Sequence, residues 1–85
     1  MSDKQQFGKN ILLSTKFASY LEDKPDAISE ISSSSEYVIL SANDKGLNEM
    51  NENIIKSLIK QGKKVIKVQE PKNPKLPWKL SIATS

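Results

Sequence analysis

The sequence EYVILSANDKGLNEMNENIIKSLIKQGKKVIKVQE, residues 36–70, decides the fold. It opens with an apolar run at 37–40, continues with apolar residues at helical spacing over 47–61, and ends with a β-branched run at 65–68. A strand, an amphipathic helix and a second strand in this order are typical of a βαβ unit. A crossover helix of this length makes the two strands parallel and the connection right-handed.

The segment before this unit has a helical pattern that ends at a proline. Apolar residues recur at steps of three and four over 7–22, so one broad face of the predicted helix is apolar. Pro25 cannot lie inside a helix and disfavours helical geometry at Lys24. The first helix is therefore predicted to end near Asp23.

A chain of 85 residues supplies one small hydrophobic core, so we expect the other segments to form a single domain with the βαβ unit. We expect residues 1–6 to be a disordered start and Pro25 to open a short second helix over 25–31. The helical segment then spans 7–31, and the serines at 32–35 are a flexible connector.

Residues 71–85 form a proline-containing basic tail. Pro71, Pro74 and Pro77 make a spacer, after which 78–82 alternates apolar and polar residues with the period of a strand. We expect a third strand or strand-like arm, added to the chain's own sheet or to that of a neighbour; a disordered tail is the alternative. The predicted fold class is α+β, with N-terminal helices, two parallel strands and a possible third strand.

Side-chain patterns also predict which surfaces are covered. The run at 37–40 is apolar at every position, which favours a strand covered on both faces, and Lys67 places part of the second strand at an edge or near solvent. Apolar surface is left over, so we expect a homodimer formed through the sheet or the helix stripe. The polar residues expected on the outer side of the second helix are Asn48, Asn51, Glu52 and Asn53.

The composition excludes several kinds of site. The chain has no cysteine and no histidine, and its thirteen cationic side chains are all lysines. Disulfides, thiolate metal sites and histidine general bases are therefore excluded, and carboxylates remain as ligands for hard cations. Lysine also cannot form the bidentate hydrogen bonds that arginine forms with phosphate or guanine.

Charge is divided unevenly along the chain. Residues 1–44 carry four lysines and seven acids, a net charge of −3, whereas residues 45–85 carry nine lysines and three acids, a net charge of +6. A basic half can face an acidic partner, nucleic acid or the acidic half of a second copy. It can also be an ordinary solvated surface.

The turn after the first strand is the main convergence of polar residues. In open α/β sheets, ligands bind beyond the carboxyl ends of the strands, often at a helix N-terminus. The residues at this place are Ser41, Asn43, Asp44, Gly46 and Asn48, with Gln69 and Glu70 from the second strand. The turn either binds a small ligand or, as its residue types favour, only caps the following helix. No metal site, cofactor or catalytic group is predicted, because no nucleophile, base and orienting residue can be assembled.

A second candidate surface is basic. Lysines can follow a phosphate backbone while an indole stacks on a base. The candidate residues for such contacts are Lys63, Lys64, Lys67, Lys72, Lys75, Trp78 and Lys79. No RNA- or DNA-binding motif accompanies them, so nucleic-acid binding is the alternative function and not the leading one.

Part of the chain resembles a known family. The residues that carry the resemblance are LSTKFASYLEDKP at 13–25, Ile28, Ile31, the run at 37–40, Asn43, Asp44 and GKKVIKV at 62–68. Over about residues 10–69 they are similar to a family of small uncharacterised prokaryotic proteins with an L-S-x-x-F-x-x-Y-L helix and a G-x-x-V-x-x-V strand. This chain has Lys24 where the family has a histidine, and its tail after Glu70 looks particular to this chain and not shared with the family. The resemblance implies helix, strand, helix, strand order and no activity.

Together these features predict a small non-enzymatic protein-interaction or accessory module. Its expected partners are a second copy and an unidentified protein. The N-terminus is polar, and the apolar run at 11–13 is too short for a signal peptide or a membrane span. We therefore expect a cytoplasmic protein without membrane association.

Overall fold

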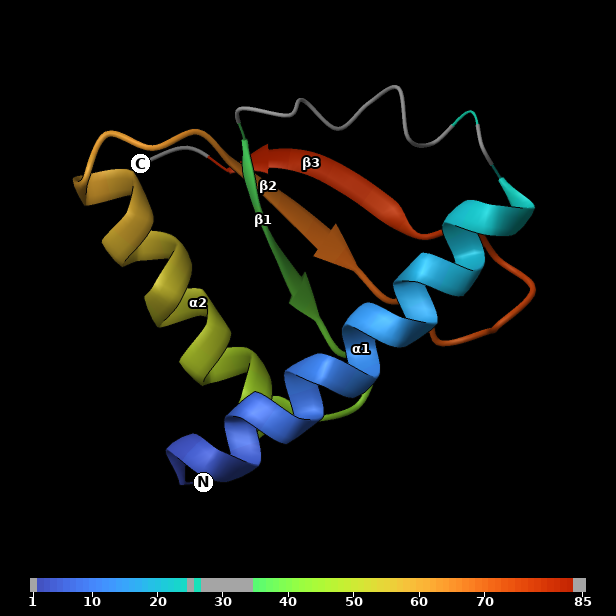
Figure 1. Ribbon diagram of the computed structural model, residues 1–85, viewed down its shortest axis with the longest axis horizontal. Helices are drawn as coiled ribbons and strands as arrows, with labels where there is room; N and C mark the ends of the chain where they lie inside the picture. The colour runs from blue at the N-terminus through green and yellow to red at the C-terminus, as the bar shows by residue number, and fades with distance from the viewer. Residues whose placement is uncertain (1, 25, 27–34, 84–85) are drawn as a thin grey trace.

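The computed structural model describes residues 2–24, 26 and 35–83 (Figure 1). The elements are α1 (Asp3–Asp23), β1 (Glu36–Leu40), α2 (Lys45–Lys60), β2 (Val65–Gln69) and β3 (Lys79–Ala83). Within the described residues the fold is thus α+β, with two helices and a three-stranded mixed sheet. The short helix predicted at 25–31 and the serines at 32–34 lie outside the described residues, except Asp26. No described helix is long and apolar enough to cross a membrane.

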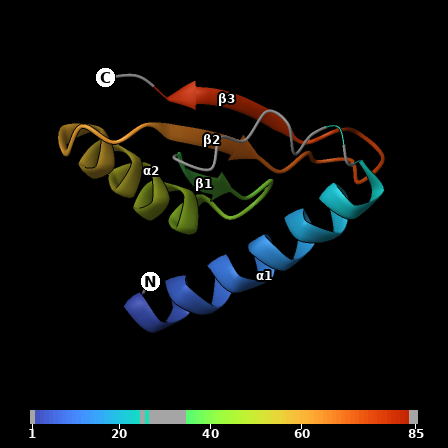
Figure 2. The same ribbon diagram turned by 45° about the horizontal axis from the view of Figure 1, so that its top comes forward.

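The strands are arranged in the order β1-β2-β3. β1 and β2 are parallel, with Tyr37 opposite Ile66, and β2 and β3 are antiparallel, with Ile66 opposite Ile82. The third strand expected from the tail is confirmed, and it joins the chain's own sheet. Figure 2 shows β3 at one margin of the sheet, beyond β2.

Of the two positions that the sequence allowed for Lys67, a sheet edge or a place near solvent, the second is the one observed. Lys67 lies on the central strand β2, half-buried, and its Nζ is 2.7 Å from Oε1 of Glu52 on α2. A lysine can cover a sheet with its aliphatic stem while its ammonium group reaches solvent or a carboxylate. One charged residue within a strand therefore does not distinguish an edge strand from a central one.

The sheet lies between the two helices (Figure 1). Alternation along β2 places Val65 and Lys67 on the face toward α2, and Ile66 and Val68 on the face toward α1. The helices approach each other at their N-terminal ends, near the carboxyl end of β1, and diverge from there. Both faces of the sheet are therefore covered most closely at this end.

This divergence corrects the expectation that the first strand is covered on both faces along its length. Ile39 and Leu40 are buried, whereas Tyr37 is 48% exposed. The start of β1 lies where the two helices have separated, so neither covers it fully. A strand can thus be apolar at every position from 37 to 40 although only its second half is buried.

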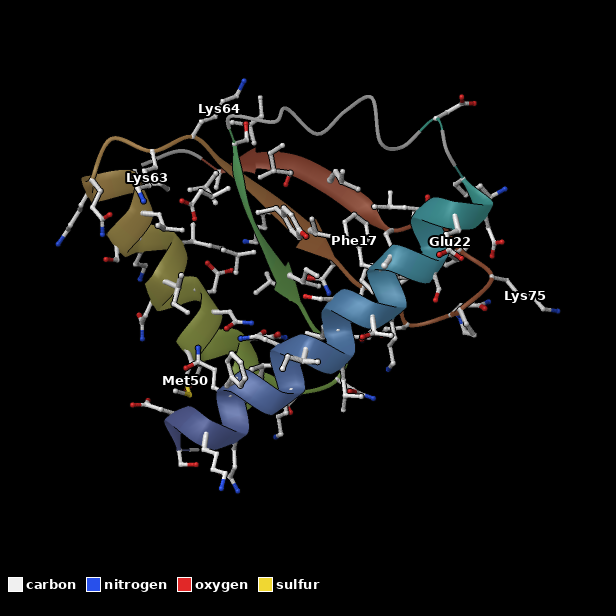
Figure 3. The ribbon with its side chains drawn as sticks, viewed as in Figure 1. Phe17, Glu22, Met50, Lys63, Lys64 and Lys75 are labelled. Carbon is white, nitrogen blue, oxygen red and sulfur yellow. The ribbon has the colours of Figure 1, made fainter. Side chains whose placement is uncertain are left out.

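Phe17 of α1 lies at the centre of the core and is 2% exposed (Figure 3). Its ring centroid is 5.3 Å from that of Trp78, 6.0 Å from that of Tyr37 and 6.2 Å from that of Tyr20. The buried cluster around it also contains Leu13, Ile39, Leu47, Ile66 and Val68. One aromatic side chain therefore joins α1 to the first strand and to the tail.

α1 begins earlier than the sequence pattern predicts. The helix starts at Asp3, although residues 1–6 were expected to be disordered, because Ser2 and Gln5 form a capping box. Gln5 N donates to Ser2 Oγ at 3.2 Å, and Ser2 N donates to Gln5 Oε1 at 3.1 Å. This exchange satisfies backbone donors that a helix start leaves open. The predicted end at Asp23 is confirmed.

Asn51 is buried, although it was expected on the outer side of the second helix. Only 1% of it is exposed, and its amide accepts from Gln6 Nε2 at 3.0 Å and Asn10 Nδ2 at 3.2 Å. The same amide donates to Ile39 O at 2.9 Å. A buried amide needs such partners, and here they tie α1, α2 and β1 together.

Gly62 ends α2 and should tolerate substitution poorly. Its φ is +78°, a left-handed conformation that costs an L-residue roughly 1–2 kcal/mol, whereas Gly8 lies inside α1, where alanine is favoured over glycine by roughly 0.5–1 kcal/mol. A Cβ at either position meets no atom within 4 Å. Urea unfolding followed by circular dichroism should therefore show that Gly62→Ala destabilises and Gly8→Ala stabilises the protein. A shift in the same direction for both would contradict this account.

Candidate functional site

The polar residues predicted at the turn after β1 do come together. Ser41 follows β1 directly and is buried. Asn48, on the first turns of α2, accepts from Ser41 N through Oδ1 at 2.6 Å and donates to Ser41 O through Nδ2 at 2.8 Å. Asn43 N donates to Ser41 Oγ at 3.3 Å. Ser41, Asn43 and Asn48 therefore hold the turn in one conformation.

Asp44 is the N-cap of α2. Its Oδ1 accepts from Leu47 N at 3.1 Å, and its Oδ2 accepts from Lys9 Nζ at 2.7 Å. The hydrogen bond from Lys9, followed by that from Leu47 N–H, holds the pKa of Asp44 below its ordinary value of 3.8, against a smaller opposing effect of burial. Asp44 thus carries a negative charge that joins α1 to the start of α2.

Two residues at the end of β2 complete the turn. Glu70 Oε1 accepts from Ala42 N at 2.9 Å, and Glu70 Oε2 is 3.4 Å from Lys16 Nζ. Gln69 Nε2 donates to Ser41 O at 3.3 Å. The carboxylate of Glu70 therefore accepts the hydrogen bond of the Ala42 backbone N–H, which could otherwise bind an anion at this end of the sheet.

Sequence reasoning missed the contribution of α1 to this place. Lys9 and Lys16 lie 35 and 54 residues from their partners Asp44 and Glu70. Lys9, Lys16 and Asp23 are spaced by seven residues, which puts them along one line of a helix. That spacing was the available signal, but the place where α1 crosses the sheet was not readable from it.

A cleft of about 490 Å³ opens beside the turn, and we call it the carboxyl-end cleft. It lies between the C-terminal half of α1, the turn after β1 and the loop between β2 and β3. Its lining includes Lys16, Tyr20, Asn43, Glu70, Pro74 and Trp78. The rings of Tyr20 and Trp78 are 6.1 Å apart at a tilt of 35°. The cleft thus combines an aromatic wall with a carboxylate.

The described residues of the turn and the cleft offer groups for binding. The polar atoms of the turn are hydrogen-bonded to one another, and no group of three or more acids that could hold a metal ion occurs in the described part of the chain. A nucleophile with an adjacent base and an orienting group is not present among these side chains.

The residues predicted to contact nucleic acid are divided between two ends of the molecule. Lys63 and Lys64 lie at one end and Lys75 at the other (Figure 3). Lys72 and Lys75 lie in the loop between β2 and β3, and Lys79 opens β3. Lys63 and Lys67 are paired with acids, at 3.2 Å and 2.7 Å, and Trp78 is half-buried against Phe17. The folded chain therefore does not bring these residues into one surface.

The charge on Asp44 should make the stability depend on pH. The pKa of Asp44 is lower in the folded than in the unfolded chain, so its contribution is complete above 3.8 and is lost as the pH falls through the folded value. Asp44→Asn keeps a good cap but loses the charge. Melting curves should therefore show the variant less stable than the parent at neutral pH, with the difference disappearing in acid. Glu49→Gln, on the exposed side of α2, should show no such convergence; a constant offset for Asp44→Asn would contradict the assignment.

A comparison with protein families finds a match over most of the chain. A model for a family of unknown function, DUF5647, matches residues 5–80. No curated protein and no solved structure shows a significant match. The match confirms the resemblance seen in the sequence and extends it into the tail after Glu70, which had looked particular to this chain. Because the match covers most of the 85 residues, the chain belongs to this family of unknown function.

Proposed function

We propose that this chain is a non-enzymatic protein-interaction module that forms a homodimer through the free edge of β3. The observation that carries the proposal is the outer edge of β3, which no strand of the described part of the chain pairs with and which lies next to exposed apolar side chains. A sheet edge with unpaired backbone groups is a template for pairing with another strand. The hydrogen bonds of the sheet identify which groups are free.

The bonds between β1 and β2 fix the direction of the backbone groups on β2. Glu36 N donates to Lys64 O, and Glu70 N donates to Leu40 O, both at 2.9 Å. Backbone groups alternate in direction along a strand. Even-numbered residues of β2 therefore point toward β1, and odd-numbered residues point toward β3.

The same alternation continues into β3. Lys67 is opposite Ser81, so the N–H and C=O groups of Ser81 point toward β2. Those of Leu80 and Ile82 point away from the sheet. Ile82 is also 63% exposed, which leaves an apolar side chain beside the free backbone groups.

The free edge of β1 differs because the helices bridge it. Asn51 donates to Ile39 O, and Asn10 of α1 is hydrogen-bonded to the same Asn51 amide. The side chains of two helices thus meet across the carboxyl half of this edge. A strand added along β1 would have to break that bridge, so β3 is the better edge for pairing.

Two copies of β3 are complementary to each other. In an antiparallel pair centred on Ser81, Leu80 lies opposite Ile82 of the second copy, and each such pair exchanges both of its hydrogen bonds. Lys79 lies opposite Ala83 of the second copy, so like charges are not placed opposite each other. A second copy therefore fits this edge without an unpaired charge.

Apolar surface beside the edge extends the contact. A groove of about 570 Å³ lies between α2 and β3, and Ile55, Ile59, Ile82 and Ala83 line part of it. Stable protein interfaces bury about 1,200–2,000 Å², which is more than two short strands supply. The groove and Ile82 provide the additional apolar area that a dimer of this kind needs.

The oligomeric state of two proline variants tests the proposal. Proline removes a backbone N–H, and it is tolerated in edge strands where that N–H faces solvent. Ile82→Pro should therefore keep the fold but convert the dimer into a monomer, as measured by light scattering across a dilution series. Ser81→Pro, the matched control, removes an N–H that bonds to β2 and should lower the melting temperature.

Two results would contradict the proposal. The first is a parent chain that stays monomeric at every concentration. The second is an Ile82→Pro variant that dimerises as strongly as the parent while its melting is unchanged.

A further inference from the structure

The carboxyl-end cleft has a chemical character that homodimer formation does not use. Its volume of about 490 Å³ is within the range of small-molecule sites, about 300–1,000 Å³. It also lies beyond the carboxyl ends of the parallel strands β1 and β2, where open α/β sheets bind ligands. We propose that this cleft binds a primary alkylammonium ion, with Glu70 as the acceptor of its charge and Tyr20 and Trp78 as the wall for its alkyl stem.

Glu70 is the fixed anion of the cleft. Only 14% of its side chain is exposed, and Oε1 is held by Ala42 N at 2.9 Å. Its second oxygen, Oε2, has a longer contact, 3.4 Å, with Lys16 Nζ. The carboxylate is therefore positioned by the backbone and keeps one oxygen available for a cation.

Lys16 indicates which cation fits. Its side chain is 63% exposed, so the ammonium can leave Glu70 for solvent at little cost. A lysine side chain is itself a primary ammonium on an aliphatic stem. The pair Lys16–Glu70 thus already places this chemical group at the site, and a free amine would take the position of Nζ.

The aromatic wall suits the rest of such a ligand. The rings of Tyr20 and Trp78 line the cleft and lie 6.1 Å apart. Aromatic faces attract ammonium groups and bury alkyl stems. An aliphatic amine can therefore place its charge at Glu70 and its stem along these rings.

The charges around the cleft favour a cation over an anion. The backbone N–H of Ala42 already donates to Glu70 and is therefore not available to bind an anion. Asp23 adds a second carboxylate to the lining. Lys72 also lines the cleft, but it is exposed on the loop between β2 and β3. The lining thus carries two acids and two lysines, but both lysines are exposed, whereas the side chain of Glu70 is largely buried and held in place.

The single tryptophan makes the test direct, because the indole of Trp78 lies in the cleft wall. The full chain is titrated with butylammonium chloride, and the fluorescence of Trp78 is compared with a sodium chloride series. Butanol and sodium butanoate have the same stem with no charge or the opposite charge. We expect a saturable change with butylammonium alone; an equal change with butanol would overturn the proposal.

Two substitutions should act in opposite directions. Glu70→Gln keeps an acceptor for Ala42 N but removes the charge, and it should weaken butylammonium binding about tenfold or more. Lys16→Met removes the competing ammonium and should tighten binding roughly two- to fivefold. Glu49→Gln on the exposed side of α2 is the matched control and should leave binding unchanged.

Each of the two variants can contradict the proposal by itself. Equal binding by Glu70→Gln and the parent would overturn it. If Glu70→Gln unfolds the turn, Lys16→Met decides alone, because Lys16 is exposed and its removal spares the turn. Unchanged or weaker binding by Lys16→Met would then overturn the proposal.

Discussion

The aromatic contact of Phe17 with Trp78 is the interaction on which the rest of the structure depends. Phe17 belongs to the first helix and Trp78 to the tail, and their rings meet at 5.3 Å beside Ile39 and Val68. Burying a phenylalanine ring against such neighbours stabilises a fold by about 3–5 kcal/mol, as judged by its removal. A small domain has few contacts of this size. This contact fixes α1 on its face of the sheet and the start of β3 beside β2.

The polar counterpart of Phe17 is Asn51. A buried amide is costly without partners, so its bonds to Asn10 and Ile39 O admit few alternative arrangements of the two helices. The same bonds bridge the edge of β1. The network that orients the helices therefore also protects one edge of the sheet. Among the described strands none pairs with the outer edge of β3, which is why the proposed dimer uses β3.

Periodicity predicted the elements well and their surroundings less well. The run at 37–40, the helix after Asp44 and the alternation at 78–82 each correspond to an observed element, because apolar spacing records which side chains must be buried. The start of α1 was also readable, since Ser2 and Gln5 match the capping-box pattern, but apolar spacing alone missed it. The burial of Asn51 and the central position of Lys67 were not readable. Both depend on partners from other elements, which a local pattern does not contain.

The candidate site, too, could be predicted only in part from local sequence patterns. It also shows how the chain, whose cationic side chains are all lysines, distributes its charge. The turn residues Ser41, Asp44 and Asn48 were found from turn and cap chemistry, whereas Lys9 and Lys16 come from a helix whose crossing angle the sequence does not specify. Ion pairs among the described residues include Lys9–Asp44, Lys16–Glu70, Lys63–Glu36 and Lys67–Glu52. Each joins different segments of the same chain, and exposed pairs of this kind contribute only about 0–1 kcal/mol. Their main effect is to place acids beside lysines, and Lys63 and Lys67 are the two members of these pairs that come from the basic half, residues 45–85. Four lysines of this chain thus pair with its own acids, and the recognition that we propose relies instead on the backbone edge of β3 and on the carboxylate of Glu70.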